Sequence, residues 1–326
     1  MKSILLKLKP YARVLGALVG FIYDFKRFYL YSGWRANMHD AEVRNYNMVK
    51  IYHSLEKNMR LGNREKDSGW NDACVLADLL RIAKESGEIG FHDKAAHNIL
   101  EKYIHLEGNA DTKKGKQIEK KISMFEFYSS EEHGVKQLSD IDCKKGMLET
   151  PETFFLSRYS LREFKSEIVD ENIIKRSIAL AMKTPSVCNR QAWHVYHITD
   201  ANTKEKALRY QRGNRGFGEN IPNLMIVTTD LRAFMPGQEH YQHWIDGGLF
   251  SMSIIYALHS LGVASCCLNW SQSPSNDKLL RSLIDIEPSH TVIMMLAIGW
   301  PDKKNNVCVS ARRPLDEVYT RMARKG

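Results

Sequence analysis

The sequence predicts an α+β fold, in which helices flank a central mixed sheet and a helical N-terminal extension precedes it. Four short segments after residue 151 are apolar and β-branched with little polar alternation, which is typical of strands covered on both faces. Segments with helical spacing separate these strands. The apolar positions of residues 1–150 follow helical spacing instead. The fold class therefore follows from these three observations.

In the first half, three stretches have helical periodicity, at residues 40–60, 71–86 and 93–105. Gly87 is suited to cap the second of these helices at its C-terminus. Residues 108–121 are polar and lysine-rich, so we expect a loop or the solvated start of a helix. Residues 129–152 lack strong periodicity and end at Pro151. We therefore place a domain boundary there, with a helical extension at 1–150 and a second domain at 151–326.

In the second half, predicted helices and strands alternate. Asp170 is a suitable N-cap for a helix that continues through Met182 and stops at Pro185. The expected strands are 193–199, 224–229, 263–268 and 291–298. The expected helices between them are 202–210, 245–261 and 274–284. The helix at 245–261 has few charges, which suits either a buried subunit interface or the core of one subunit.

Composition narrows the possible functions. The formal net charge is +9 and the basic residues are dispersed, with no recognisable nucleic-acid-binding motif. We therefore expect a solvated basic surface and no nucleic-acid partner. Six cysteines show neither metal-ligand spacing nor a Cys-x-x-Cys pair. Free, mostly buried thiols in a reducing cytoplasm are the expectation, and no metal site is predicted.

The N-terminal 30 residues combine apolar, aromatic and basic residues. The uninterrupted apolar run is too short to span a bilayer of about 30 Å, and no small-residue cleavage site of a signal peptide is evident. Two interpretations remain for this segment. It can lie as a basic, aromatic-rich helix on an anionic membrane surface, or it can pack on its own protein. We favour the second.

Two polar blocks carry the functional prediction. Arg158, Ser160 and Arg162 lie within five residues, before the helix that follows Asp170. Guanidinium groups bind phosphate through parallel charge-assisted hydrogen bonds, and a serine adds a further contact. The loop from Pro185 to Trp193 then offers Ser, Asn and Gln side chains, which suit the polar groups of a nucleotide-like ligand. Taken alone, the arginines favour an interpretation as members of surface ion pairs.

The order of these blocks resembles the nitroreductase-like FMN-dependent oxidoreductase family. Its signature runs Arg-Arg-Ser-x-Arg-x-Phe, then Ala-Pro-Ser-x-x-Asn-x-Gln-Pro-Trp. Residues 262–270 and 297–301 match two further family segments, and Arg312 opens the closing Arg-x-Pro-Leu motif. The resemblance covers about residues 151–320. It implies a homodimer with FMN sites across the subunit interface, and transfer of hydride from NAD(P)H to flavin N5 and then to an acceptor.

The resemblance also implies the cofactor-binding residues. Arg158, Ser160 and Arg162 would hold the phosphate and the pyrimidine side or ribityl chain, Arg312 would add a phosphate contact, and residues of the 185–191 loop would come from the partner subunit. No catalytic acid or base is nominated. The full set of expected FMN contacts is Arg158, Tyr159, Ser160, Arg162, Pro185, Ser186, Asn189, Gln191, Gln211, Asn214, Cys267, Leu268, Asn269, Trp270 and Arg312. The chain departs from the family at Tyr159, usually Arg or His, at Ala192, usually Pro, and at Ser310, where some members have Lys.

A further block, His53-Ser54-Leu55-Glu56-Lys57, resembles a motif that precedes the flavin domain in a subset of these proteins, often among polysaccharide-related functions. The residues can form part of a substrate lid, or they can be a solvated helix face. Two functions therefore remain open. One is an NAD(P)H-dependent FMN reductase with an undetermined acceptor. The other is a nicotinamide-independent or non-redox flavin protein with a partner-binding N-terminal module. The Gly-rich run at 213–218 does not have the spacing of a dinucleotide fingerprint.

Overall fold

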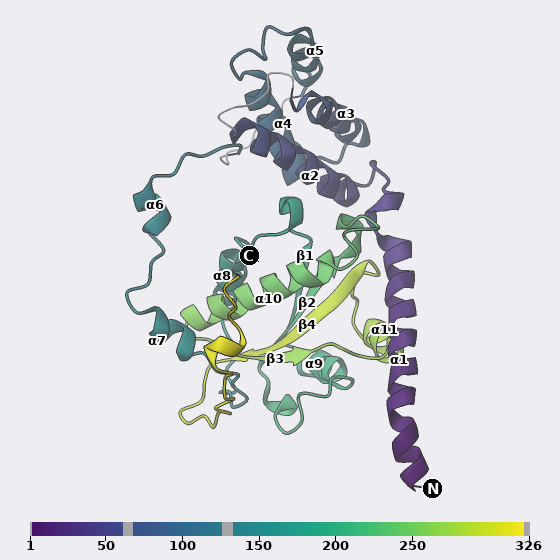
Figure 1. Ribbon diagram of the computed structural model, residues 1–326, viewed down its shortest axis with the longest axis vertical. Coiled ribbons are helices and arrows are strands. Elements are labelled where there is room, and N and C mark those ends of the chain that lie inside the picture. Colours follow the sequence, from purple (N-terminus) through teal and green to yellow (C-terminus); the bar gives the residue numbers. More distant parts are fainter. Residues whose placement is uncertain (1, 61–67, 126–132, 323–326) are drawn as a thin grey trace.

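A computed structural model describes residues 2–60, 68–125 and 133–322. Its centre is a four-stranded sheet with the order β1-β2-β4-β3. The strands are β1 (Trp193–Ile198), β2 (Asn223–Asp230), β3 (Ala264–Asn269) and β4 (His290–Gly299). All three neighbouring pairs are antiparallel. Figure 1 shows the sheet crossed on one face by a long helix, α10.

Helices cover both faces of the sheet, and the two-residue period of a strand sorts the side chains between them. Leu224 and Ile226 of β2 share one apolar core with α9 (Ala201–Leu208) and α11 (Pro274–Leu283). Met225 and Val227 belong to the opposite core, with α8 (Glu171–Ala181) and α10 (Gln242–Ser260). Every residue of β2 is buried. The predicted α+β class is confirmed.

The expected elements of the second half are all present, with small shifts at their ends. The Asp170 side chain accepts a hydrogen bond from the Asn172 amide, as expected of the N-cap of α8, and this helix ends at Ala181, four residues before Pro185. The sheet differs from the expected mixed sheet in its strand directions. Among the described residues, parallel pairing occurs at an isolated bridge between Ser160 and Ser265, while the four strands themselves are antiparallel.

Four helices of the first half pack into a bundle with its own apolar core (Figure 1). They are α2 (Ala41–Arg60), α3 (Trp70–Ser86), α4 (Phe91–Ile104) and α5 (Lys113–Ile122). Gly87 ends α3 with a φ of 73°, as a left-handed cap requires. The expectation of a loop or solvated helix start at 108–121 is wrong for α5, because Ile118 and Ile122 are buried in the bundle core.

Two short helices follow the bundle in the order of the chain, α6 (Asp140–Lys144) and α7 (Pro151–Leu156). The boundary at residue 150 stays a prediction, although α7 begins with Pro151 at a position where proline is favoured. The remaining elements are 3₁₀ turns: η1 (Gly33–Arg35), η2 (Val187–Asn189), η3 (Gly218–Asn220), η4 (Leu231–Ala233) and η5 (Leu315–Glu317).

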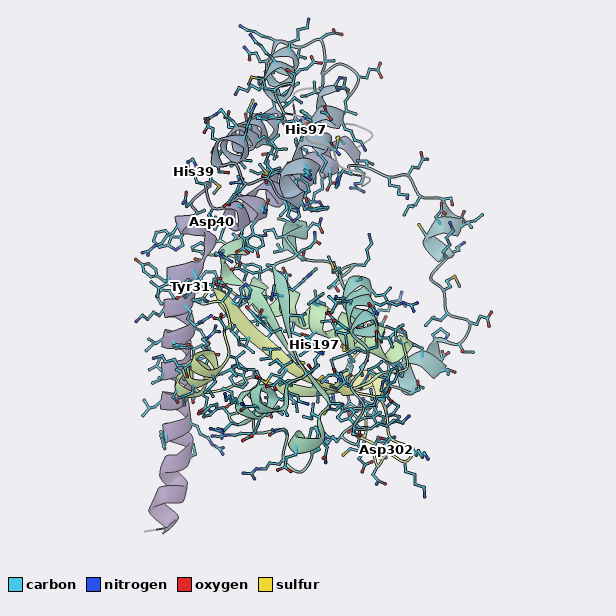
Figure 2. All side chains as sticks on the ribbon, turned by 180° about the vertical axis from the view of Figure 1, so that it is seen from behind. Tyr31, His39, Asp40, His97, His197 and Asp302 are labelled. Atoms are coloured by element: carbon cyan, nitrogen blue, oxygen red, sulfur yellow. The ribbon has the colours of Figure 1, made fainter. Side chains whose placement is uncertain are left out.

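The first helix, α1 (Lys2–Tyr31), stands beside the sheet half rather than within the bundle (Figure 1). Arg27 donates to the carbonyl of His290 at 2.8 Å, and the Tyr23 hydroxyl donates to Asp277 at 2.8 Å. In Figure 2, Tyr31 marks the end of α1, and His39 and Asp40 mark the turn into the bundle. The expected packing on the protein itself is present, and it combines these polar contacts with the packing of Phe28 against Ala233 and Phe234.

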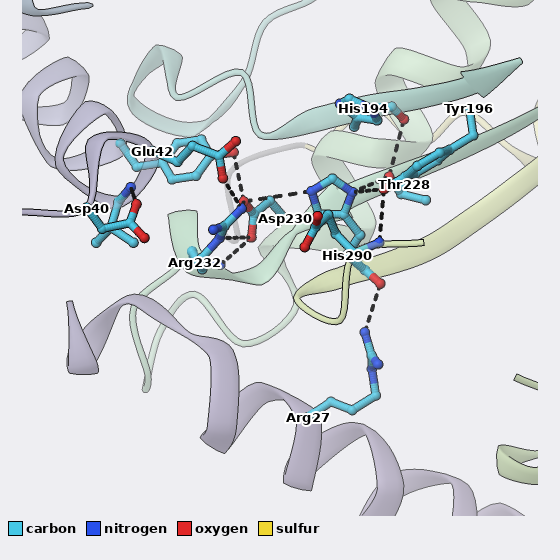
Figure 3. Close-up of polar contacts among 12 residues, drawn as sticks. Arg27, Asp40, Glu42, His194, Tyr196, Thr228, Asp230, Arg232 and His290 are labelled. Carbon is cyan, nitrogen blue, oxygen red and sulfur yellow. Dashed lines mark hydrogen bonds and ion pairs between the residues drawn. The ribbon is translucent and has the colours of Figure 1, made fainter. Parts of the chain in front are cut away.

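A network of charges joins α2 to the end of β2 (Figure 3). Arg232 pairs with both Glu42 of α2 and Asp230 of β2. The Tyr46 hydroxyl donates to Asp230 at 3.1 Å, and burial beside this carboxylate raises the pKa of Tyr46. The bundle is therefore attached to the sheet half through contacts between residues about 190 positions apart in the chain.

The six cysteines are free thiols, but the expectation that most are buried is wrong. Cys266 is buried, Cys74 and Cys188 are half-buried, and Cys143, Cys267 and Cys308 are exposed. The adjacent Cys266 and Cys267 differ because successive strand residues face opposite sides of the sheet.

Candidate functional site

The arginine block lies along the free edge of β3. Ser160 bridges Ser265, and the Leu161 amide donates to the Ser265 carbonyl at 3.1 Å. A second bridge joins Phe164 to Pro301, just beyond β4. These backbone contacts hold the chain from Arg158 to Phe164 against the sheet. Arg158, Ser160 and Arg162 therefore come from one segment that an edge strand supports.

Arg158 and Arg162 provide positive charge beside β3. Burial raises the pKa of the Cys267 thiol, and the Arg158 guanidinium acts in the opposite direction. Arg162 has the same effect on the buried Cys266. Within the described ranges, neither arginine forms an ion pair with a carboxylate. The alternative prediction of surface ion pairs therefore finds no support among these residues, and both guanidinium groups are available to an anion.

One side of β3 is exposed next to Arg158. Cys267 and Asn269 are exposed, whereas Leu268 and Trp270 are buried in the core. The Trp270 indole N–H donates to Asp277 at 2.9 Å. Gln211 reaches the same strand, because its amide nitrogen donates to the Asn269 carbonyl at 2.9 Å. The structure thus places Arg158, Ser160, Arg162 and Gln211 along the strand that carries Cys267 and Asn269, and it uses the side chains of Leu268 and Trp270 for packing.

The polar loop at 185–191 has a strained backbone. Cys188, Asn189 and Gln191 have φ values of 50°, 54° and 51°, in a region that costs a non-glycine residue about 1–3 kcal/mol. The loop is held by one local and one long-range bond: the Gln191 amide donates to the Ser186 hydroxyl at 3.0 Å, and the Val187 amide donates to Asp246, 59 residues away, at 3.2 Å. Such strain is concentrated at binding sites, where it fixes side chains in advance.

A buried ion pair anchors this loop, and the sequence did not indicate it. The Arg190 side chain is 1% exposed and donates to both carboxylate oxygens of Glu239, at 2.7 and 2.9 Å. It also donates to the carbonyls of Ala233 and Val187. Burial would raise the pKa of Glu239, but Arg190 and the Met235 amide hold it below its usual value. Glu239 lies 49 residues from Arg190, so local spacing carried no signal.

A cleft of about 1040 Å³ opens between the bundle and β1. Asn189 and Gln191 line it from the strained loop, and Tyr52 and Glu56 line it from α2. The other lining residues include Phe91, His92, Met182, Lys183, Trp193 and His194. Burial lowers the pKa of His92 to about 4, so its ring is neutral at pH 7 and exchanges a hydrogen bond with the Tyr52 hydroxyl at 2.8 Å.

The His53–Lys57 block is split between this cleft and solvent. Glu56 lines the cleft, where one carboxylate oxygen accepts from the Gly134 amide at 3.3 Å and the other pairs with His53 at 3.0 Å. Lys57 is exposed. The structure therefore places one member of the motif beside the predicted loop residues.

Among the remaining predicted residues, Arg312 and Asn214 form no described hydrogen bond to these two groups, whereas Tyr159 lies within the arginine block and Pro185 begins the strained loop. Arg312 is exposed and donates to the carbonyl of Ser310 in its own segment. Asn214 donates to the Leu208 carbonyl at 3.3 Å and lines a separate cavity of about 680 Å³ beside α9. Tyr159 is 42% exposed, and Pro185 is exposed. A single chain thus presents two distinct surfaces. One is the arginine edge, formed by Arg158, Ser160 and Arg162 beside β3, and the other is the strained polar loop at 185–191.

Comparison with known proteins gives an independent indication of the family that this chain resembles. The nitroreductase family pattern matches residues 156–214. The NADH dehydrogenase of Thermus thermophilus is 24% identical over 198 residues, covering 51% of this chain and 93% of that protein. The iodotyrosine deiodinase of Nematostella vectensis is 22% identical over 190 residues, covering 49% of this chain and 70% of that protein.

A solved FMN-dependent nitroreductase of Clostridium difficile superposes with a TM-score of 0.44 and 19% identity, covering 52% of this chain and 98% of that one. These relatives all correspond to about half of the present chain. The family match at 156–214 begins before the arginine block and continues through the strained loop. The resemblance stated from the sequence is confirmed: residues 156–214 match the nitroreductase family pattern, and about half of this chain is similar to the curated relatives.

Proposed function

We propose that this protein is an FMN-dependent oxidoreductase that takes hydride from NAD(P)H and passes it to a small-molecule acceptor. The observation that carries the proposal is the pair of guanidinium groups, Arg158 and Arg162, beside β3 with no carboxylate partner among the described residues. The nitroreductase match at 156–214 includes both arginines. The relatives named NADH dehydrogenase and FMN-dependent nitroreductase support the same chemistry.

The residues present fit FMN. Arg158 and Arg162 provide cationic donors for its phosphate, and Ser160 adds a hydroxyl on the same backbone segment. The Gln211 side chain is buried and bonded to the backbone, since it donates to the Asn269 carbonyl and accepts from the Gly213 amide, so its part is to support the end of β3. When bound, FMN supplies the hydride chemistry. The protein's part is to bind and orient it, and no side chain is assigned as acid or base.

We further propose that the active form is a homodimer. The arginine edge and the loop at Asn189 and Gln191 form no described hydrogen bond to each other, so a second subunit can bring them into one site. Trp244, Ile245 and Leu249 expose an apolar face of α10, which suits burial between subunits. Sedimentation of the flavin-loaded protein tests this, and a stoichiometrically loaded monomer would contradict it.

The bundle is proposed to narrow access to the flavin. Glu56, Asn189 and Gln191 line the same cleft between α2 and the strained loop. An acceptor that enters this cleft therefore passes the Glu56 carboxylate. Glu56→Gln should change the relative rates of reoxidation by cationic and anionic quinones, whereas Glu101→Gln on the exposed side of α4 should not. Identical rates of Glu56→Gln and wild type with every quinone would reject the lid.

Cofactor retention tests the assignment of the arginines. Arg158→Gln removes one charge-assisted hydrogen bond, so FMN affinity should fall about ten- to a hundred-fold, corresponding to roughly 1.5–3 kcal/mol. The matched control is Arg176→Gln, an exposed arginine of α8 with no assigned role. Both variants are dialysed and their FMN dissociation constants are measured by flavin fluorescence. Equal affinity in Arg158→Gln and Arg176→Gln would remove Arg158 from the site.

A further inference from the structure

Helix α1 displays an apolar face that the other described residues do not cover. Its members recur at helical spacings of three and four residues, so they share one side of the helix. Their side chains are 46–70% exposed. We call this face the outer stripe, and it consists of Tyr11, Val14, Leu15, Leu18, Phe21, Ile22, Phe25 and Tyr29. It extends over about 27 Å at 1.5 Å per residue.

The opposite side of α1 makes the contacts with the body. The buried Arg27 donates to the His290 carbonyl, and Tyr23 donates to Asp277. An ordinary surface helix buries its apolar face and exposes its polar face. Helix α1 has largely the reverse orientation, because the side chains that bind the protein are polar apart from Phe28, while the apolar residues of the outer stripe face outward. Residues 10–19 are exposed throughout, and this end of α1 extends beyond the body (Figure 1).

The inner end of the outer stripe has an aromatic and cationic border. The rings of Tyr29 and Trp34 lie 5.3 Å apart, and the Arg35 guanidinium lies 4.5 Å from each ring centroid. Trp34 is 44% exposed. Side chains that combine an aromatic body with a polar tip are favoured where an apolar medium meets water.

The charge around the stripe has one sign. Residues 1–35 contain seven Lys or Arg residues and a single acidic residue, Asp24. Asp24 lines the small cavity between α1 and the body, together with Tyr23 and Arg27. Lys26 follows Ile22 by four residues, so it lies beside the stripe. The outward surface therefore presents apolar and positive groups together.

These observations distinguish two possible occupants. A second copy of the helix would place basic residues against basic residues in either direction, without the opposite charges that pair two helices. An anionic lipid surface satisfies both the apolar stripe and the positive border. We propose that α1 lies along an anionic membrane surface with its outer stripe inserted into the interface. Among the described residues, no helix is long and apolar enough to cross a bilayer.

Flotation of the full chain with vesicles tests the proposal. The protein should float with vesicles containing phosphatidylserine and phosphatidylcholine, and it should remain unbound with phosphatidylcholine alone. Ile22→Glu introduces a charge into the stripe and should abolish flotation. Ile141→Glu is the matched control, because Ile141 of α6 is 69% exposed and Ile22 is 59% exposed. Unchanged thermal unfolding of both variants shows that the loss does not come from misfolding.

A charge variant completes the test. Arg13→Gln combined with Lys26→Gln should lower partitioning onto the anionic vesicles roughly 25-fold, because each basic residue near such a surface contributes about a five-fold factor. The proposal is overturned if wild type fails to float with anionic vesicles, or if Ile22→Glu floats like wild type. Sedimentation without vesicles supplies the remaining outcome: a smaller oligomer for Ile22→Glu than for wild type would assign the stripe to a second copy.

Discussion

Replacement of Arg190 by Gln should cost about 3 kcal/mol of folding free energy. The Arg190 side chain is 1% exposed and its partner Glu239 is 21% exposed. Removing one member of a buried ion pair costs about 3–5 kcal/mol, since the other charge stays behind. The partial exposure of Glu239 places the expected loss at the lower end. Two carbonyls, those of Ala233 and Val187, also lose a donor.

The loss should extend to the strained loop that Arg190 anchors. Cys188, Asn189 and Gln191 keep positive φ values while the surrounding bonds hold them, so the variant should also bind FMN more weakly. Urea unfolding of wild type, Arg190→Gln and Arg209→Gln measures the stability difference. Arg209 pairs with Glu205 at 3.4 Å on an exposed face, and its replacement should cost less than about 1 kcal/mol. A similarly small cost for Arg190→Gln would refute the reasoning.

Two further predictions concern pH and packing. Burial lowers the pKa of His243 to about 4 from 6.5, so the unfolded chain binds the proton more readily and stability is lost as pH falls from 6.5 towards 4. His243→Phe should therefore reduce the acid destabilisation by about 2 kcal/mol near pH 5, whereas the control His39→Phe, at an exposed position, should not. Equal pH profiles of the two variants in urea unfolding would contradict this. A Cβ at Gly247 would lie 2.5 Å from Ile293 Cγ1, whereas nothing lies within 4 Å of one at Gly248; Gly247→Ala should therefore lower the unfolding temperature, at a cost of about 1–3 kcal/mol, and Gly248→Ala should not.

Sequence periodicity predicted those parts of the fold that depend on local chemistry. The strands and helices after residue 170 are confirmed, because the apolar runs of the strands and the Asp170 cap depend on neighbouring residues. The same holds for Gly87, which ends α3 in the first half of the chain. The packing of α5 in the bundle was not predicted, because its sequence is rich in lysine and contains two isoleucines, Ile118 and Ile122, that turn out to be buried.

The site was predictable where residues are close in sequence and not where distant residues meet. The arginine block and β3 were identified from adjacent residues, and the structure joins them through the Ser160–Ser265 bridge. The Arg190–Glu239 anchor and the direction of the α1 stripe depend on tertiary contacts, which no local pattern specifies. Trp270 has the family spacing, but its indole is committed to Asp277. Residue type alone could not indicate which way its ring turns.

The central claim is that the arginine edge beside β3 binds a flavin that NAD(P)H reduces. The most direct measurement is the visible absorption spectrum of the FMN-loaded full chain under anaerobic conditions, before and after addition of NADH or NADPH. The account predicts that one of the two nucleotides bleaches the flavin band and that an added quinone restores it. A flavin band that neither nucleotide changes, in protein that chemical reduction with dithionite does bleach, would contradict the claim.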